Sequence, residues 1–196
     1  MAVEPPVAGG LEGLAQEVKK VRGPPPVHLW NPPYCGDLDI RIAADGTWFY
    51  MKTPIGRLPL VKLFSSVLKR EEGRYFLVTP VEKIGIVVDD APFAAVELRV
   101  EGEGRERRLS FRTQVEEWAE VGPDHALRFE KEDGTDGVKP YIHIRRDLWA
   151  RVSRALLHDL ADIGEVVAVA GIDWFGVYAS GTFYPMVRAD ELEGLM

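Results

Sequence analysis

The segment TPIGR, residues 53–57, brings together residue types that suit the binding of an anion. It leads into an expected helix whose first turn contains Pro59, a residue well suited to that position. Backbone N–H groups in the first turn of a helix have no partner within the helix, and together they favour a negative charge. Gly56 lets a ligand approach the backbone closely, and Arg57 can form two hydrogen bonds with one phosphate or carboxylate. With Lys52 at the end of the preceding strand, the segment predicts an anion-binding site.

The same segment has a plainer interpretation. It can be an ordinary turn between a strand and a helix in which Arg57 pairs with a nearby acid. The sequence alone leaves both interpretations open.

A second basic segment, HIRRD at residues 143–147, is predicted to take the same position in the second half of the chain. It precedes another expected helix, for which Asp147 would be a good N-cap. Two such segments facing each other across a domain interface would form a basic cleft on an otherwise acidic protein. The residues predicted to bind the ligand are Lys52, Gly56, Arg57, His143, Arg145 and Arg146.

Other reactive residue types show no recognisable pattern. The histidines have no metal-ligand spacing, and the single cysteine, Cys35, adds no second sulfur ligand. Free cysteines are among the most buried residue types, so a structural role is expected for Cys35. Neither a GxGxxG nor a GxxxxGK[ST] phosphate loop occurs. We therefore predict no metal, no cofactor and no catalytic residue.

Composition and charge narrow the class of protein. The chain has 196 residues, of which 46% are hydrophobic and 28% are charged, values typical of a folded globular protein. Its net charge of −7 opposes a nucleic-acid partner, because such binding requires a basic surface. No apolar run is long enough to span a membrane, and the start of the chain, MAVEPPVAGG, lacks the features of a signal peptide. A cytoplasmic location without membrane contact is expected.

The first half of the chain must position the TPIGR segment. Apolar residues at helical spacing predict a helix over 11–21, which the RGPPPV run stops. Two alternating strands meet at Asp45-Gly46, which is typical of a tight hairpin. After TPIGR, one face of the next helix is predicted to be core, formed by Leu60, Leu63, Phe64, Val67 and Leu68. Two further strands, YFLVT and IGIVV, complete the first repeat.

The second half shows a similar order. The runs ALRFEK and KPYIHIRR resemble strands, LWARVSRALLHDL resembles a helix, and VVAVA and DWFGVYAS resemble strands again. Both halves are therefore interpreted as β-β-α-β-β units. A charged meander over 94–121 is expected to enlarge the second sheet. The predicted class is α+β, with two related antiparallel sheets that each carry a helix.

We divide the chain on this basis into four parts. They are an N-terminal helix with a proline-rich strut (1–26), a first α+β repeat (27–92), a second α+β domain (93–190) and a C-terminal tail (191–196).

Several long segments resemble a known bacterial family. They are HLWNPPYCGDLDIRIAADGTWFY, TPIGRLPLVKLFSSVL, YFLVTPVEKIGIVVDDAPF and KPYIHIRR, which lie between about His28 and Pro185. The chain resembles the family of domains of unknown function that carries the number 1285. This resemblance implies a duplicated α+β fold whose second half superficially resembles a pleckstrin-homology domain. It also implies a nucleotide-like ligand between the domains and a role in signal transduction, and it supplies no catalytic residues.

The expected function is a non-enzymatic module that binds a nucleotide-like or other small anionic ligand at the interdomain cleft. Two alternatives stay open. One is an adaptor that binds a protein partner through an exposed sheet edge or groove. The other is an enzyme whose active site is dispersed through the fold.

Overall fold

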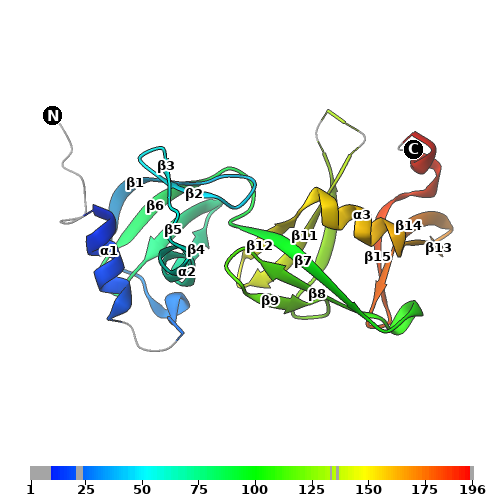
Figure 1. The fold of residues 1–196 in the computed structure, drawn as a ribbon, viewed down its shortest axis with the longest axis horizontal. Helices are drawn as coiled ribbons and strands as arrows, with labels where there is room; N and C mark the ends of the chain where they lie inside the picture. The colour runs from blue at the N-terminus through cyan, green and yellow to red at the C-terminus, as the bar shows by residue number, and fades with distance from the viewer. Residues whose placement is uncertain (1–9, 21–23, 133, 136, 195–196) are drawn as a thin grey trace. The chain divides into compact units, whose positions relative to one another are not determined.

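The computed structural model describes residues 10–20, 24–132, 134–135 and 137–194 (Figure 1). The chain divides into two compact units, unit 1 (Met1–Pro92) and unit 2 (Phe93–Met196). Parts of the predicted N-terminal segment 1–26 and of the predicted tail 191–196 lie outside the described residues.

Unit 1 carries two α-helices, a 3-10 helix and one sheet in its described residues. The elements are α1 (Gly10–Lys19), η1 (Val27–Leu29), β1 (Tyr34–Ile42), β2 (Trp48–Tyr50), β3 (Thr53–Pro54), α2 (Leu58–Ser66), β4 (Leu68–Glu71), β5 (Arg74–Val78) and β6 (Lys83–Val88). The strand order is β3-β2-β1-β6-β5-β4. β1 and β6 run parallel, whereas the other neighbours are antiparallel.

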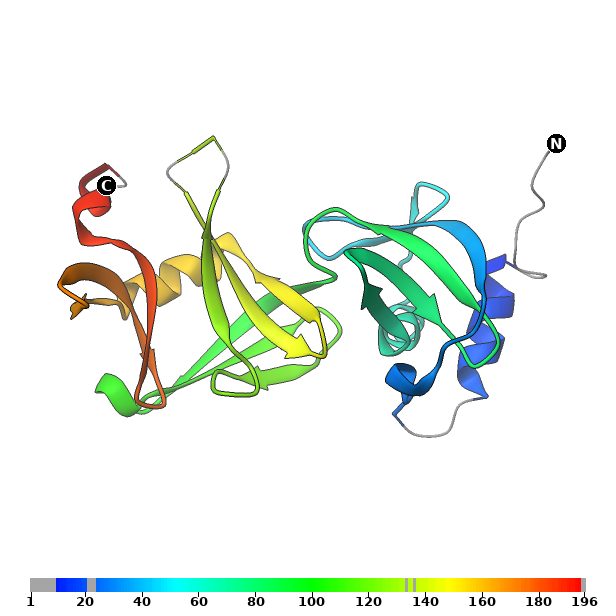
Figure 2. The same ribbon diagram turned by 180° about the vertical axis from the view of Figure 1, so that it is seen from behind.

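Unit 2 carries a sheet of the same size, one α-helix and a small extra sheet in its described residues (Figure 2). The elements are β7 (Phe93–Glu101), η2 (Gly104–Glu106), β8 (Arg108–Thr113), β9 (Trp118–Glu120), β10 (Leu127–Lys131), β11 (Val138–Arg145), β12 (Leu148–Val152), α3 (Arg154–Asp162), β13 (Glu165–Val169), β14 (Ile172–Ala179), β15 (Thr182–Arg188) and η3 (Ala189–Gly194). The large sheet has the order β10-β11-β12-β7-β8-β9, and the small one has the order β13-β14-β15.

The two large sheets have the same topology. Numbered from the start of each unit, the strands lie in the order third, second, first, sixth, fifth, fourth. In both sheets the first and sixth strands form the central pair, and this pair is parallel. The predicted α+β class with two related units is therefore confirmed. The sheets are mixed rather than wholly antiparallel, because each contains this parallel pair.

The predicted β-β-α-β-β order is wrong in its detail. Each unit builds its large sheet from six strands, and only unit 1 places a helix between the third and fourth strands. The run 148–152, expected to begin a helix, is the strand β12, in which Leu148, Ala150 and Val152 alternate inward. Helix α3 starts later, with Ser153 rather than Asp147 as its N-cap. The sequence pattern was ambiguous because a short apolar run fits either period.

The hairpin before TPIGR and the helix after it form largely as predicted. Asp45-Gly46 makes the turn between β1 and β2, where Gly46 has a φ of 84° and the Asp45 carboxylate accepts a hydrogen bond from the Thr47 amide at 2.9 Å. Helix α2 begins at Leu58 as expected but ends at Ser66, and Leu68 starts a strand instead. Its buried face is formed by Val61, Phe64 and Ser65, whereas Leu60 and Leu63 are only half-buried.

The core of unit 1 lies where α2 meets the sheet. The side chains of Phe64 and Trp48 are fully buried, and their rings stack with centroids 6.4 Å apart and planes 24° apart. Ile40 and Ile42 of β1 are buried in the same unit. The amide of Ile55 in the TPIGR segment donates to the Trp48 carbonyl at 2.8 Å, so this core also anchors the start of α2.

Ionisation of the Glu82 carboxyl group makes the stability of the folded state depend on pH. Burial raises the pKa of Glu82 above its ordinary value of 4.5, and the negative charge of Glu17 raises it further. The ionised form therefore destabilises the folded state at neutral pH, and this effect disappears as pH falls through the raised pKa and below 4.5. We expect Glu82→Gln to raise the free energy of unfolding at pH 7 by no more than about 1 kcal/mol.

Thermal melting from pH 7 down to pH 4 measures this effect. The gain from Glu82→Gln should shrink toward zero at the acidic end, and Glu103→Gln, at an exposed site, should change little throughout. A gain for Glu82→Gln that grows as pH falls would contradict the assignment.

No helix in the described part of the chain is long and apolar enough to cross a membrane.

Candidate anion-binding site

The N-terminus of α2 lacks a side-chain cap. Its N-cap is Arg57, with extended backbone angles (φ −95°, ψ 97°), and Pro59 lies in the first turn. The Arg57 carbonyl accepts the first helical hydrogen bonds, from the amides of Leu60 at 2.9 Å and Val61 at 3.1 Å. The amides of Gly56, Arg57 and Leu58 make no backbone hydrogen bond within the described residues. They are available to a ligand or to water.

The space above this helix terminus is open. Gly56 is exposed, and a Cβ atom built on it would meet no atom within 4 Å. By contrast, α3 closes its own N-terminus, because the Ser153 hydroxyl accepts a hydrogen bond from the Leu156 amide at 3.5 Å. Of these two nine-residue helices, α2 is the one without a side-chain cap at its N-terminus.

The cations beside this terminus have no carboxylate partner in the described part of the chain. Arg57 and Lys52 are both exposed, and neither forms an ion pair there. Lys52 lies in the tight turn between β2 and β3 with a φ of 64°. The alternative interpretation, in which Arg57 pairs with a nearby acid, thus finds no support among the described residues.

The second predicted segment does not precede a helix. Arg145 ends β11 and Arg146, with a φ of 53°, lies in the tight turn to β12. In the repeat this turn joins the fifth and sixth strands, so its counterpart in unit 1 is the turn between β5 and β6. The counterpart of the TPIGR segment is instead the connection 121–126 between β9 and β10. The predicted equivalence of the two segments is therefore wrong.

Arg145 and His143 are engaged within unit 2. Arg145 forms an ion pair with Glu117, and its guanidinium lies 4.9 Å from the centroid of the Phe93 ring. Nδ1 of His143 lies 2.8 Å from the Asp124 carbonyl oxygen, and Nε2 contacts the Arg146 carbonyl oxygen. Both ring nitrogens of His143 therefore contact backbone carbonyl oxygens of this region.

Arg146 experiences the excess positive charge of this turn. Burial lowers the pKa of Arg146, the neighbouring charge of Arg145 lowers it further, and Glu117 opposes both effects. A bound anion would reduce this repulsion, as any opposite charge does at close range. The β11–β12 turn is therefore a second position that suits an anion, although not one built like the first.

The predicted site residues form two local groups in the structure. Lys52, Gly56 and Arg57 share one segment of unit 1, and His143, Arg145 and Arg146 share one turn of unit 2. Glu117 was missed because its contact with Arg145 crosses 28 positions of the chain. The uncapped start of α2 did leave a signal, since an arginine stands where Ser, Thr, Asp or Asn would cap a helix.

No group of three or more metal-ligating side chains lies together in the described ranges. Cys35 is half-buried, and its thiol donates to the Pro33 carbonyl at 3.4 Å.

These features define a class of protein: a duplicated α+β module with two mixed six-stranded sheets and a small third sheet. Two family models cover most of the chain. The one described as "Domain of unknown function (DUF1285), N-terminal domain" matches residues 25–91, and the one described as "Protein of unknown function (DUF1285), C-terminal domain" matches residues 92–186. The chain belongs to the DUF1285 family.

Two solved structures resemble the chain. A DUF1285 family protein from Silicibacter pomeroyi DSS-3 is 49% identical, with a TM-score of 0.86 over 95% of this chain and 99% of that one. A DUF1285 family protein from Shewanella baltica OS155 is 28% identical, with a TM-score of 0.49 over 63% of this chain and 90% of that one. No curated protein matches the chain significantly.

Proposed function

We propose that this protein is a non-enzymatic module that binds a small anionic, nucleotide-like ligand and serves as a sensor in signal transduction. The observation that carries the proposal is the uncapped N-terminus of α2. There, three consecutive amides without a backbone acceptor lie beside the open face of Gly56 and the exposed side chain of Arg57.

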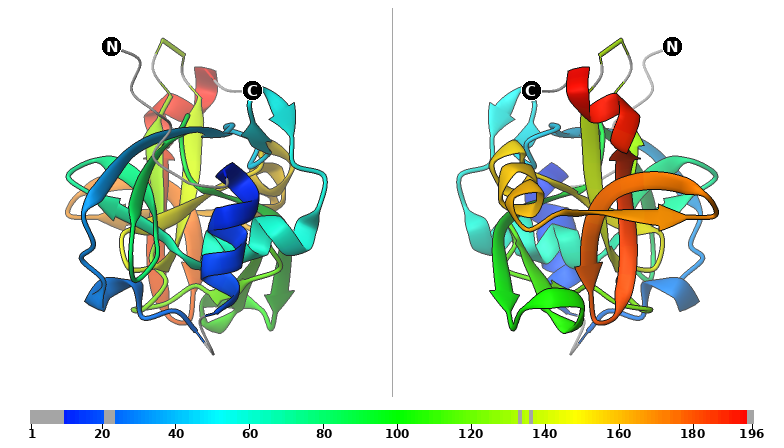
Figure 3. Two further views of the ribbon diagram at one scale, coloured as in Figure 1. Left: turned by 90° about the vertical axis from the view of Figure 1, so that its left-hand side faces the viewer. Right: turned by 90° about the vertical axis from the view of Figure 1, so that its right-hand side faces the viewer.

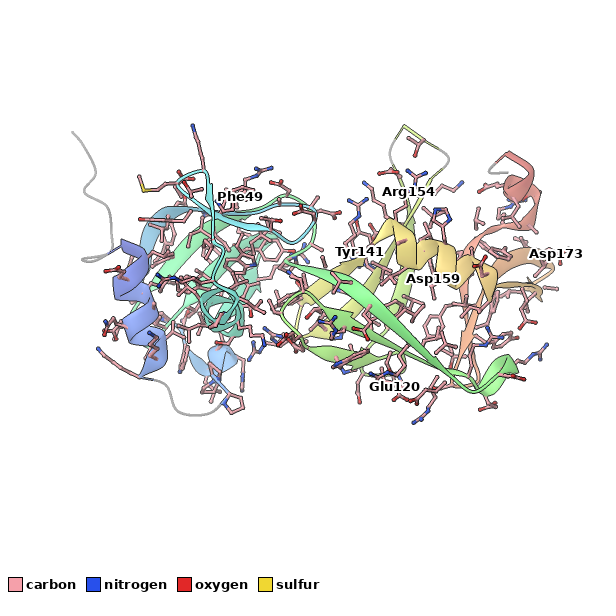
Figure 4. All side chains as sticks on the ribbon, in the orientation of Figure 1. Phe49, Glu120, Tyr141, Arg154, Asp159 and Asp173 are labelled. Carbon is pink, nitrogen blue, oxygen red and sulfur yellow. The ribbon has the colours of Figure 1, made fainter. Side chains whose placement is uncertain are left out.

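The chemistry of this terminus suits a phosphate group. Amide hydrogens and the positive end of the helix dipole favour a compact anion, and an arginine can bond two of its oxygens. Lys52 adds a second positive charge to the same strand-turn-helix segment. Phe49, half-buried on β2 and labelled in Figure 4, pairs across the ladder with Pro54 and supplies an aromatic surface in this segment. An aromatic side chain in the same segment as a phosphate site favours a nucleotide over inorganic phosphate.

The β11–β12 turn of unit 2 supports the same class of ligand. Arg145 and Arg146 concentrate positive charge there, and the lowered pKa of Arg146 reflects both burial and repulsion from Arg145.

A thermal-shift panel of nucleotides, nucleotide second messengers and phosphorylated metabolites tests the proposal. A ligand that binds only the folded state should stabilise it by about 2.7 kcal/mol at roughly 100 times its dissociation constant. For a chain of this size, the melting temperature should rise by roughly 5–10 °C.

Matched variants locate the site. Arg57→Ala and Gly56→Ala should each remove most of the shift and leave the melting temperature without ligand unchanged, because both positions are exposed and the added methyl group at 56 fits freely. Arg154→Ala is the control, since Arg154 is also an exposed arginine at the start of a nine-residue helix, but one whose N-terminus is capped by Ser153. The proposal fails if no nucleotide shifts the wild type, or if hits persist in both unit 1 variants.

A further inference from the structure

The hairpin of β13 and β14 leaves one long side of β13 unpaired. Within the described residues, β13 pairs only with β14, at the border of the small sheet (Figure 3). The hairpin turns through Ala170 and Gly171, whose φ angles of 51° and 79° indicate a two-residue type I′ turn. In such a hairpin the two flanking residues, Val169 and Ile172, bond to each other, and partners alternate from there. The N–H and C=O groups of Val166 and Ala168 therefore point away from β14.

These outward groups have no backbone partner in the part of the chain that the structure describes. Val166 is 53% exposed, and Ala168 is also exposed. An unpaired strand edge of this kind is a template for another extended segment.

Other sheet edges carry features that oppose such pairing. The edge strand β3 is two residues long and contains Pro54. The edge strand β4 lies against η1, and its Lys69 ammonium donates to the Trp30 carbonyl at 3.1 Å. The edge strand β10 carries alternating charges, LRFEK. By contrast, residues 166–172 contain no charged side chain and no proline. The edge of β13 thus lacks the usual protection against strand pairing.

The same hairpin exposes apolar side chains. Val166, Val169 and Ile172 are 53%, 42% and 41% exposed. Together with the free backbone groups, they offer main-chain bonds for affinity and apolar contacts on both faces of the hairpin for selectivity.

Acidic residues precede and follow the apolar run 166–172 in the chain. They are Asp159, Asp162, Glu165 and Asp173, of which Asp159 on α3 and Asp173 on β14 are labelled in Figure 4. None of the four forms an ion pair within the described residues. The last turn of α3 contains no basic residue, so its two aspartates also face the unfavourable end of the helix dipole. The edge therefore combines an apolar centre with uncompensated negative charge.

We propose that the outer edge of β13 binds an extended segment of a partner protein, apolar at its centre and flanked by lysine or arginine. The segment adds a fourth strand to the small sheet, and its basic flanks pair with the acidic side chains. Charge complementarity favours this partner over a second copy of the chain, because self-pairing would bring two acidic rims together on a protein of net charge −7. The site is separate from the anion site, so either can fail without the other.

Titration of isotope-labelled protein with the peptide KKVTVTVKK, followed by amide NMR, tests the inference. The basic peptide should bind at least about tenfold more tightly than the matched peptide EEVTVTVEE, and more weakly as salt rises. Hydrogen exchange at the Val166 and Ala168 amides should slow by about tenfold or more on binding.

Three variants test the position. Ala168→Pro removes an amide hydrogen that points away from β14, and Val166→Lys places a charge on the edge; both should weaken binding by about tenfold or more. Val87→Lys is the control, because Val87 is similarly exposed, at 58%, but lies on the central strand β6. It should bind as wild type does.

Each of the following three outcomes would overturn the proposal. Absence of saturable binding up to about 1 mM, or equal binding of the two peptides, would exclude a basic-flanked partner strand. Binding that survives both Ala168→Pro and Val166→Lys would place the contact elsewhere. A concentration-dependent dimer of wild type in sedimentation, abolished by both edge variants, would assign the edge to a second copy instead. Melting curves show whether either edge variant is folded, and one folded variant suffices for the test.

Discussion

Replacing Phe64 with alanine is expected to lower the free energy of unfolding by about 3–5 kcal/mol. The Phe64 side chain is fully buried and stacks on Trp48, so its removal loses buried apolar surface and leaves a cavity. The ring fixes α2 on the sheet, and α2 in turn fixes the candidate anion site. Urea unfolding followed by circular dichroism measures the loss.

Lys62→Ala is the matched control on the same helix. Lys62 is only half-buried on α2, and its loss should lower the free energy of unfolding by about 0.5 kcal/mol or less. Similar losses for the two variants would show that Phe64 is not a core residue of the helix.

Gly176→Ala is expected to destabilise unit 2 by about 3 kcal/mol or more. A Cβ atom at residue 176 would lie 2.2 Å from the Tyr184 carbonyl oxygen and 2.9 Å from the Pro185 Cα atom. Both are backbone atoms of the neighbouring strand β15, so no side-chain rotation relieves the clash. β14 and β15 would have to separate where Gly176 pairs with Pro185.

Gly122→Ala distinguishes a local clash from a general intolerance of alanine. A Cβ atom at Gly122 would meet no atom within 4 Å, and this variant should melt within about 2 °C of wild type. Hydrogen exchange should be faster for Gly176→Ala in the β14–β15 ladder. A wild-type melting temperature for Gly176→Ala would mean that the two strands are not held this closely.

Local patterns predicted the elements that depend on neighbouring residues. The Asp45-Gly46 turn and the start of α2 near Pro59 each depend on a few adjacent residues, whose backbone preferences are strong. The strand β12 was missed because Leu148-Trp149-Ala150-Arg151-Val152 fits a strand by alternation and also continues into a true helix. Pairing with β7 and β11 decides between the two, and that pairing is not local.

The residues of the candidate site also divide into those that a local pattern can predict and those that it cannot. The TPIGR segment could be found because Gly56, Arg57 and the start of α2 are consecutive in the chain. The surroundings of Arg145 could not, because the order of strands places Glu117 beside it. The two basic segments looked alike because of their sequence context alone. The strand order shows that they do not occupy equivalent positions in the two repeats.

In each large sheet, the first strand pairs with the sixth at the centre. This pairing has a consequence for folding during biosynthesis. In unit 1, β1 gains its parallel neighbour only when Lys83–Val88 has left the ribosome, and in unit 2 β7 waits in the same way for Leu148–Val152. Such distant pairing requires closing a long loop and slows folding. Each unit nevertheless closes on itself, so we expect the nascent chain to fold in two successive steps, with the first sheet completed while most of the second is still being synthesised.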